Sequence, residues 1–207
     1  MEKDTQHLEQ LAEIRDIMSK STRFLSLSGL SGVIAGIAAL GGAWATYHYL
    51  GNNFSFPKTS AGVDSSELIQ FLLIVAAAVL AVAIGFGSIF TLRKAKNNGQ
   101  SVFNASGRRL LINLFIPLMT GGALSLILIY HGLFFLLPST TLIFYGLALI
   151  NASKYTLEDI RYLGMCEIAL GLISALFIGY GLLFWAIGFG LLHIVYGTIM
   201  YFKYDRA

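Results

Sequence analysis

Residues 68–92 read LIQFLLIVAAAVLAVAIGFGSIFTL, which is 25 residues without one charged side chain. A helix that crosses the roughly 30 Å hydrocarbon core of a bilayer needs about 20 apolar residues. The strands of a membrane barrel would instead alternate apolar and polar residues over about ten positions. This stretch therefore predicts a transmembrane α-helix.

Five further windows of the same kind flank this stretch. They lie at 24–50, 110–130, 132–152, 162–180 and 182–202. Of the 25 Asp, Glu, Lys and Arg residues in the 207-residue chain, only Glu167 falls inside the six windows. Charged residues make up 12% of the chain, about half the share in soluble domains. The sequence predicts an all-α integral membrane protein, with residues 24–207 forming six transmembrane helices joined by short loops.

The distribution of basic residues predicts the orientation of these helices. With both termini in the cytoplasm, 13 of the 14 Lys and Arg residues lie in cytoplasmic segments and only Lys58 lies outside. Cytoplasmic loops of membrane proteins carry such an excess of basic residues. We therefore expect cytoplasmic N and C termini, and a multi-pass protein of the bacterial inner (plasma) membrane, in contact with membrane lipids.

The last four windows resemble a tandem repeat of helical hairpins. Residues 109–155 align with 158–204, a shift of 49 positions, with 11 identities in 47. Biased apolar composition alone would give about half as many identities. The hairpin turns are short, and we expect His131 with Gly132 to reverse the chain in the first hairpin and Gly181 alone to do so in the second.

Small residues in the first window point to close helix packing. Ser28, Gly32 and Gly36 follow one another at intervals of four and form one stripe on a helix. Packing against another span of the same chain is the favoured interpretation, with a homodimer seam as the alternative. Pro117 lies inside the third span and predicts a kink, with Thr120 near enough to help satisfy the freed carbonyl group.

Residues 1–23 predict an amphipathic cytoplasmic helix. Its apolar side consists of Leu8, Leu11, Ile14 and Met18, and its polar side of Glu9, Glu13, Asp16 and Lys20. Residues 1–23 hold four basic and five acidic side chains, whereas a lipid-surface helix usually presents a basic face. We expect this helix to pack on the basic 93–109 loop or on a soluble protein partner.

Glu167 is the strongest candidate for a functional side chain, because ionisable residues within spans often mark ion or substrate pathways. Thr156 and Asp159 predict the N-cap and capping box of its helix. A structural role for Glu167 is an equal alternative. Its expected partners by depth are Asn113 and His193; a histidine there is more simply a structural bridge than a proton relay.

The sequence favours neither an enzyme nor a cofactor protein. It contains no GxxxxGKS, GxGxxG, HExxH, CxxC or GxSxG string and a single cysteine, Cys166. His48, His131 and Asp64 are weak candidates for a metal site; their spacing is not diagnostic, and interfacial histidines are the simpler interpretation. The net charge of +3 is spread along the cytoplasmic side, so no nucleic-acid partner is expected.

Two functions remain. The first is a non-enzymatic interaction or sensing module that works through residues 1–23 and the basic loop, with a homo-oligomer or a cytoplasmic protein as partner. The alternative is a small proton-linked transporter or channel that uses Glu167 with His193 and Asn113.

Overall fold

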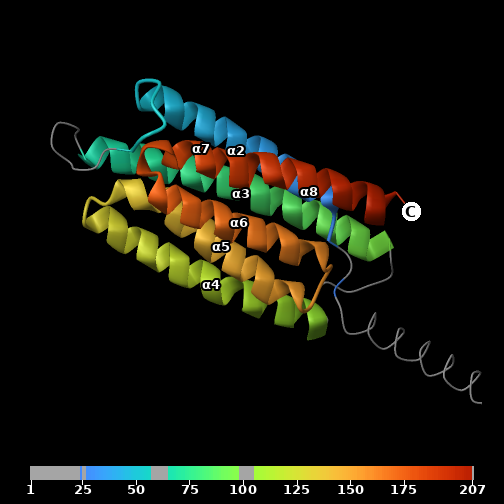
Figure 1. Ribbon diagram of the computed structural model, residues 1–207. Helices are drawn as coiled ribbons and strands as arrows, with labels where there is room; N and C mark the ends of the chain where they lie inside the picture. Colours follow the sequence, from blue (N-terminus) through green and yellow to red (C-terminus); the bar gives the residue numbers. More distant parts are fainter. Residues whose placement is uncertain (1–23, 25–26, 57–64, 98–104, 207) are drawn as a thin grey trace, which may run out of the picture.

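The computed structural model describes residues 24, 27–56, 65–97 and 105–206, and every regular element within them is helical, which confirms the predicted all-α class. The helices lie side by side (Figure 1). They are α2 (Gly29–Tyr49), α3 (Ser65–Asn97), α4 (Ala105–Tyr130), α5 (Leu137–Ser153), α6 (Asp159–Leu176), α7 (Gly181–Trp185) and α8 (His193–Met200), with the short 3₁₀ turns η1 (Phe134–Leu136) and η2 (Ile178–Tyr180). Two π-helical segments, η3 (Ala186–Leu192) and η4 (Tyr201–Asp205), flank α8. The predicted amphipathic helix at 1–23 lies outside the described residues.

We use the name C-terminal helix for the continuous run of α7, η3, α8 and η4, residues 181–205. Within the described residues, five helical stretches are long and apolar enough to cross a membrane. They are Gly29–Tyr49, Ser66–Asn97, Ala105–Tyr130, Phe134–Ser153 and Ile178–Asp205. Large apolar side chains such as Ile74, Ile84 and Met119 are more than half exposed on the outer surface. An apolar exterior of this kind is typical of a protein that has lipid as its solvent.

We define the basic end of the bundle as the end where Lys94, Lys154 and Lys203 lie. There α3 and α4 extend beyond their predicted windows, whereas α2 begins at Gly29, inside the predicted window 24–50. α3 continues to Asn97, and α4 begins at Ala105. Most of the predicted basic loop 93–109 is therefore helical, and only 98–104 lies outside the described residues. Lysines in the last turn of α3 face the negative end of its dipole, which favours continued helix.

The two predicted hairpin turns have different outcomes. Gly132 has a φ of 70°, a left-handed conformation that glycine adopts without strain, and it lies two residues after the end of α4 at Tyr130. The prediction that Gly181 alone reverses the chain is wrong, because Gly181 is already helical with a φ of −53°. The reversal uses Phe177 and η2 instead, since two helices cannot turn back on each other within one residue.

The predicted N-cap of α6 is also wrong. The cap residue is Glu158, and no side-chain hydrogen bond caps the helix. Thr156 instead donates its hydroxyl proton to the carbonyl oxygen of Phe24, over 2.7 Å, and is fully buried. Because the hydroxyl group of Thr156 makes this tertiary hydrogen bond, it does not cap α6 as its position in the sequence suggested.

Glycine residues form two close helix contacts. A Cβ atom added at Gly146 of α5 would lie 2.6 Å from the carbonyl oxygen of Gly164 on α6, and one added at Gly164 would lie 2.7 Å from that of Gly146. The second contact joins α2 to the C-terminal helix, where Gly36 faces the carbonyl oxygen of Gly190. The predicted stripe at Ser28, Gly32 and Gly36 thus packs within the chain, because backbones can approach closely only where side chains are absent.

Candidate functional site

Glu167 lies on the buried face of α6, and its side chain is 0% exposed. Gly164 and Gly171 occupy the same face and let α5 approach, so the carboxyl group points into the bundle. Neither carboxyl oxygen has a hydrogen-bond partner. A buried carboxyl group without a donor is costly in a low-dielectric interior, so this position requires an explanation beyond packing.

His193 is the nearest ionisable side chain to this carboxyl group in the described structure. Its Nδ1 atom lies 3.4 Å from Oε1 of Glu167 and 3.0 Å from the carbonyl oxygen of Gly188. Its Nε2 atom lies 2.7 Å from the hydroxyl oxygen of Tyr145 on α5. A proton on Nδ1 would be donated to Gly188, leaving Nε2 to accept the hydroxyl proton of Tyr145.

We call Glu167, His193, Tyr145 and Gly188 the Glu167 cluster. Gly188 provides the space for the carboxyl group, because an added Cβ would lie 2.5 Å from Oε2 of Glu167 and would overlap Leu142. It belongs to η3, the π-helical segment that ends directly before His193. Segments of π-helix are rare and often occur at functional sites.

Three side chains of the cluster are of types that can carry a proton. An imidazole ring can receive a proton on one nitrogen and release another from its second nitrogen. Here one ring nitrogen faces a carboxyl group and the other a phenol, so three groups that exchange protons stand in series. No metal or organic cofactor is needed for such a transfer.

The sequence identified two members of this cluster and missed two. Glu167 and His193 stood out as polar residues deep within apolar windows. Tyr145 was overlooked, although it lies in the middle of its window and away from the span ends, where tyrosines usually gather. Gly188 has no sequence signal that separates it from the other glycines, since its role depends on the helix opposite.

Asn113 lies apart from the Glu167 cluster. Its side-chain amide donates to the carbonyl oxygen of Arg109, over 2.8 Å, within α4. Its own carbonyl oxygen accepts a hydrogen bond from the side chain of Asn151 on α5. The predicted partnership between Asn113 and Glu167 is therefore not what the structure shows, because the asparagine is engaged on the α4–α5 side of the bundle.

The weak metal candidates do not form a cluster in the described part of the chain. His48 packs its ring against Trp44, with the ring centroids 4.5 Å apart, and His131 packs against Tyr130. Asp64 lies outside the described residues. Within the described ranges, no three His, Cys, Asp or Glu side chains are grouped as a metal ion would require.

Asp159 ties α6 to the C-terminal helix at the basic end. Its Oδ2 atom accepts hydrogen bonds from Tyr204, over 2.7 Å, and from Lys203, over 2.9 Å. Partial burial by itself would raise the pKa of Asp159, but the hydrogen bonds from Tyr204 and Lys203 outweigh it and lower that pKa below the ordinary value of 3.8. The carboxylate therefore stays ionised at physiological pH.

Comparison of the chain with protein-family models, with curated proteins and with solved structures finds no match. What the protein does must therefore be inferred from its own residues.

Proposed function

We propose that this chain is a small proton-linked transporter or channel in which the Glu167 cluster binds and releases the proton. The observation that carries the proposal is the fully buried carboxyl group of Glu167, which lacks a hydrogen-bond donor and lies beside His193. A glutamate kept only for structure would be expected to have its oxygens paired, because each unpaired buried oxygen costs stability. A carboxyl group that gains and loses a proton must instead be accommodated in both its protonated and its ionised form.

The proposal includes six membrane crossings with cytoplasmic N and C termini. α6 is 18 residues long, and two of its three charged residues, Asp159 and Arg161, lie in its first turn. Beyond that turn, Glu167 is the one charged group up to the end of η2 at Tyr180, and the proposal takes 162–180 as the sixth span. The alternation of basic segments supports this topology, and the proposal places the protein in a bacterial inner membrane.

The tandem hairpin repeat belongs to the same proposal. It rests on the 11 sequence identities rather than on equivalent packing. Gly122 of α4 has no neighbour within 4 Å of an added Cβ, whereas its counterpart Gly171 of α6 faces Ile143. Duplicated hairpins would have diverged once one of them moved to the interior of the bundle.

An interaction or sensing role for residues 1–23 is the second candidate. One observation favours it: Phe24 is buried and its amide donates to the carbonyl oxygen of Tyr155, over 2.7 Å. This contact fixes the residue that follows 1–23 at the basic end of the bundle. Residues 1–23 would then meet a cytoplasmic protein, or a second copy of the chain in a homo-oligomer, at that end.

Proton flux into proteoliposomes tests the proposed function. A pH-sensitive dye inside the vesicles would report proton entry under an imposed pH gradient, with and without a membrane potential. We expect Glu167→Gln to reduce the flux at least tenfold, because the amide cannot release a proton. Ser174→Ala is the matched control, since Ser174 is also a buried, unpaired polar residue of α6 but does not titrate. Equal flux in the wild type and Glu167→Gln would refute the proposal.

A further inference from the structure

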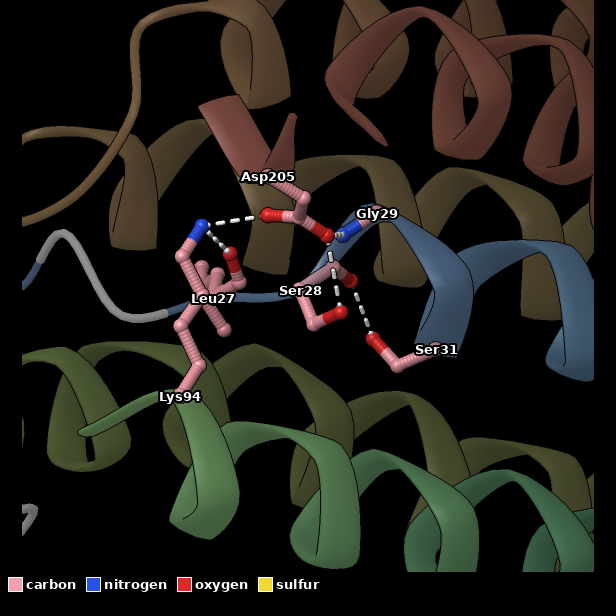
Figure 2. Close-up of polar contacts among 6 residues, drawn as sticks. All are labelled: Leu27, Ser28, Gly29, Ser31, Lys94 and Asp205. Carbon is pink, nitrogen blue, oxygen red and sulfur yellow. Dashed lines mark hydrogen bonds and ion pairs between the residues drawn. The ribbon is translucent and has the colours of Figure 1, made fainter. Parts of the chain in front are cut away.

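A polar clamp joins three helices at the basic end of the bundle (Figure 2). We define the clamp as Asp205, Lys94, Ser28 and Gly29. Asp205 accepts hydrogen bonds through Oδ2 from the amide of Gly29, over 2.9 Å, and from the hydroxyl of Ser28, over 3.0 Å. Its Oδ1 atom pairs with the ammonium group of Lys94 on α3, which also donates to the carbonyl oxygen of Leu27.

The clamp caps α2 with a residue from the far end of the chain. The first amide groups of a helix lack partners within it, and the positive end of the helix dipole favours an anion there. Ser28 stands at the N-cap position, but its side chain caps no amide and donates to Asp205 instead. The side chains of Lys94 and Asp205 are only 17% and 10% exposed, so water screens their attraction weakly.

The contact between α2 and the C-terminal helix is close, and the clamp lies at its basic end. Much of this contact is backbone against backbone: an added Cβ at Gly197 would lie 2.7 Å from the carbonyl oxygen of Gly29, and one at Gly36 would lie 2.6 Å from that of Gly190. Side-chain ridges fixed in grooves normally set how two helices align. Leu40 of α2 and Ile194 of the C-terminal helix lie over these glycines, and the clamp adds directional polar contacts that fix the alignment at the basic end.

The C-terminal helix carries the clamp at its end and His193 near its middle. Asp205 ends the π-helical segment η4, and α8 continues from Met200 back to His193 as regular α-helix, so the helical backbone is continuous between the two residues. A regular helix transmits a shift or rotation along its axis.

We propose that the clamp regulates the Glu167 cluster by fixing the position of His193 beside Glu167. This inference rests on the proposed function, because it names the regulation of the same site. When the clamp opens, the C-terminal helix shifts along the glycine contact, and His193 leaves its hydrogen bond with Tyr145 on α5. The coupling is reciprocal, so a change of proton occupancy at the cluster also changes the stability of the clamp.

Nitrogen NMR of the histidine side chains tests the coupling without measuring transport. The full chain, labelled with ¹⁵N-histidine in detergent micelles, gives signals from four histidines, and His193→Asn assigns those of His193. We expect Asp205→Ala to shift both ring-nitrogen signals of His193 by more than the linewidth. Thr198→Val is the matched control, because Thr198 lies on α8 between the two sites, is exposed and bonds only within its helix.

The histidine signals and the proton flux together distinguish the clamp from the proton-transport function. Unchanged His193 signals in a folded Asp205→Ala protein would overturn the proposal, as would an equal shift in Thr198→Val. If Asp205→Ala does not fold, Asp205→Asn and Lys94→Met remove the ion pair but leave an oxygen for the amide of Gly29, and the same shift is expected in both. Lost flux in Glu167→Gln with unchanged His193 signals in the clamp variants would refute the clamp alone. Shifted signals with unchanged flux in Glu167→Gln would refute only the proton-transport function.

Discussion

The side-chain amide of Asn151 on α5 donates to the carbonyl oxygen of Asn113 on α4, over 2.9 Å. That carbonyl group is the one that Pro117 leaves without a donor, because proline has no amide proton to give to the residue four positions earlier. Thr120, the residue expected to help, bonds to Ile116 instead. A neighbouring helix therefore repairs the break in α4.

Removing this repair should destabilise the protein. We expect Asn151→Leu to lower the free energy of unfolding by about 1–3 kcal/mol, the usual cost of an unsatisfied buried polar group. Thermal unfolding in detergent would measure it. In the Pro117→Ala background the backbone amide at 117 can reach Asn113, so Asn151→Leu should then cost much less. An equal cost in both backgrounds would show that the hydrogen bond does not compensate for the proline.

The space at Gly188 should be necessary for the Glu167 cluster. Gly188→Ala places a methyl group 2.5 Å from Oε2 of Glu167, and we expect it to destabilise the fold by about 1–3 kcal/mol, as overpacking does. Gly85→Ala is the control, because nothing lies within 4 Å of an added Cβ on that exposed turn of α3. Thermal unfolding compares the two variants, and similar melting temperatures would contradict the packing at Gly188.

The two halves of the sequence repeat should respond differently to the same substitution. Gly171→Ala brings a Cβ to 2.6 Å from the side chain of Ile143 and should lower the melting temperature, with a cost of about 1–3 kcal/mol. Gly122→Ala, at the aligned position of α4, meets no atom within 4 Å and should be neutral or slightly stabilising, since alanine favours helix. Equal effects at both positions would mean that the hairpins pack alike.

Acid should weaken the tie between α6 and the C-terminal helix. Because the pKa of Asp159 is lowered in the folded protein, its contribution to stability is present above the ordinary value of 3.8 and is lost as the pH falls through the lower, folded value. We expect the wild type to melt above Asp159→Asn at pH 5–7 and the difference to vanish at lower pH. Lys203 is 53% exposed, so the difference should be small and should decrease with salt. A difference that grows on acidification would show that the carboxylate is not stabilised by folding.

Apolar segregation predicted where the helices run, but it could not predict how they pair. Among the described residues, each predicted window contains helix, because a lipid-facing exterior imposes its composition on whole segments. The contacts of Thr156 with Phe24 and of Asn151 with Asn113 join residues far apart in sequence, and no local pattern encodes them. The ends of α3 and α4 also escaped prediction, since hydropathy marks the bilayer core and not the polar turns beyond it.

The Glu167 cluster was likewise predicted only in part. Glu167 and His193 were visible as polar residues in apolar windows, whereas Tyr145 joins them through a hydrogen bond that depends on the packing of α5 against the C-terminal helix. The clamp could not be predicted from the sequence, because Asp205 and Lys94 look like ordinary charged residues at the ends of spans. Sequence patterns indicate which residues are unusual, and the tertiary contacts decide what they meet.

The carboxylate that completes the start of α2 is separated from Ser28 by 177 positions. A ribosome therefore delivers the first span to the membrane long before it makes the residue that caps it. Until Asp205 emerges, water or lipid headgroups must satisfy the amide of Gly29, and α2 lacks its final hydrogen-bond partner at that end. A nascent chain stalled a few codons before Asp205 would contain α2 through α8 and would still lack the carboxylate that binds the first amide group of α2.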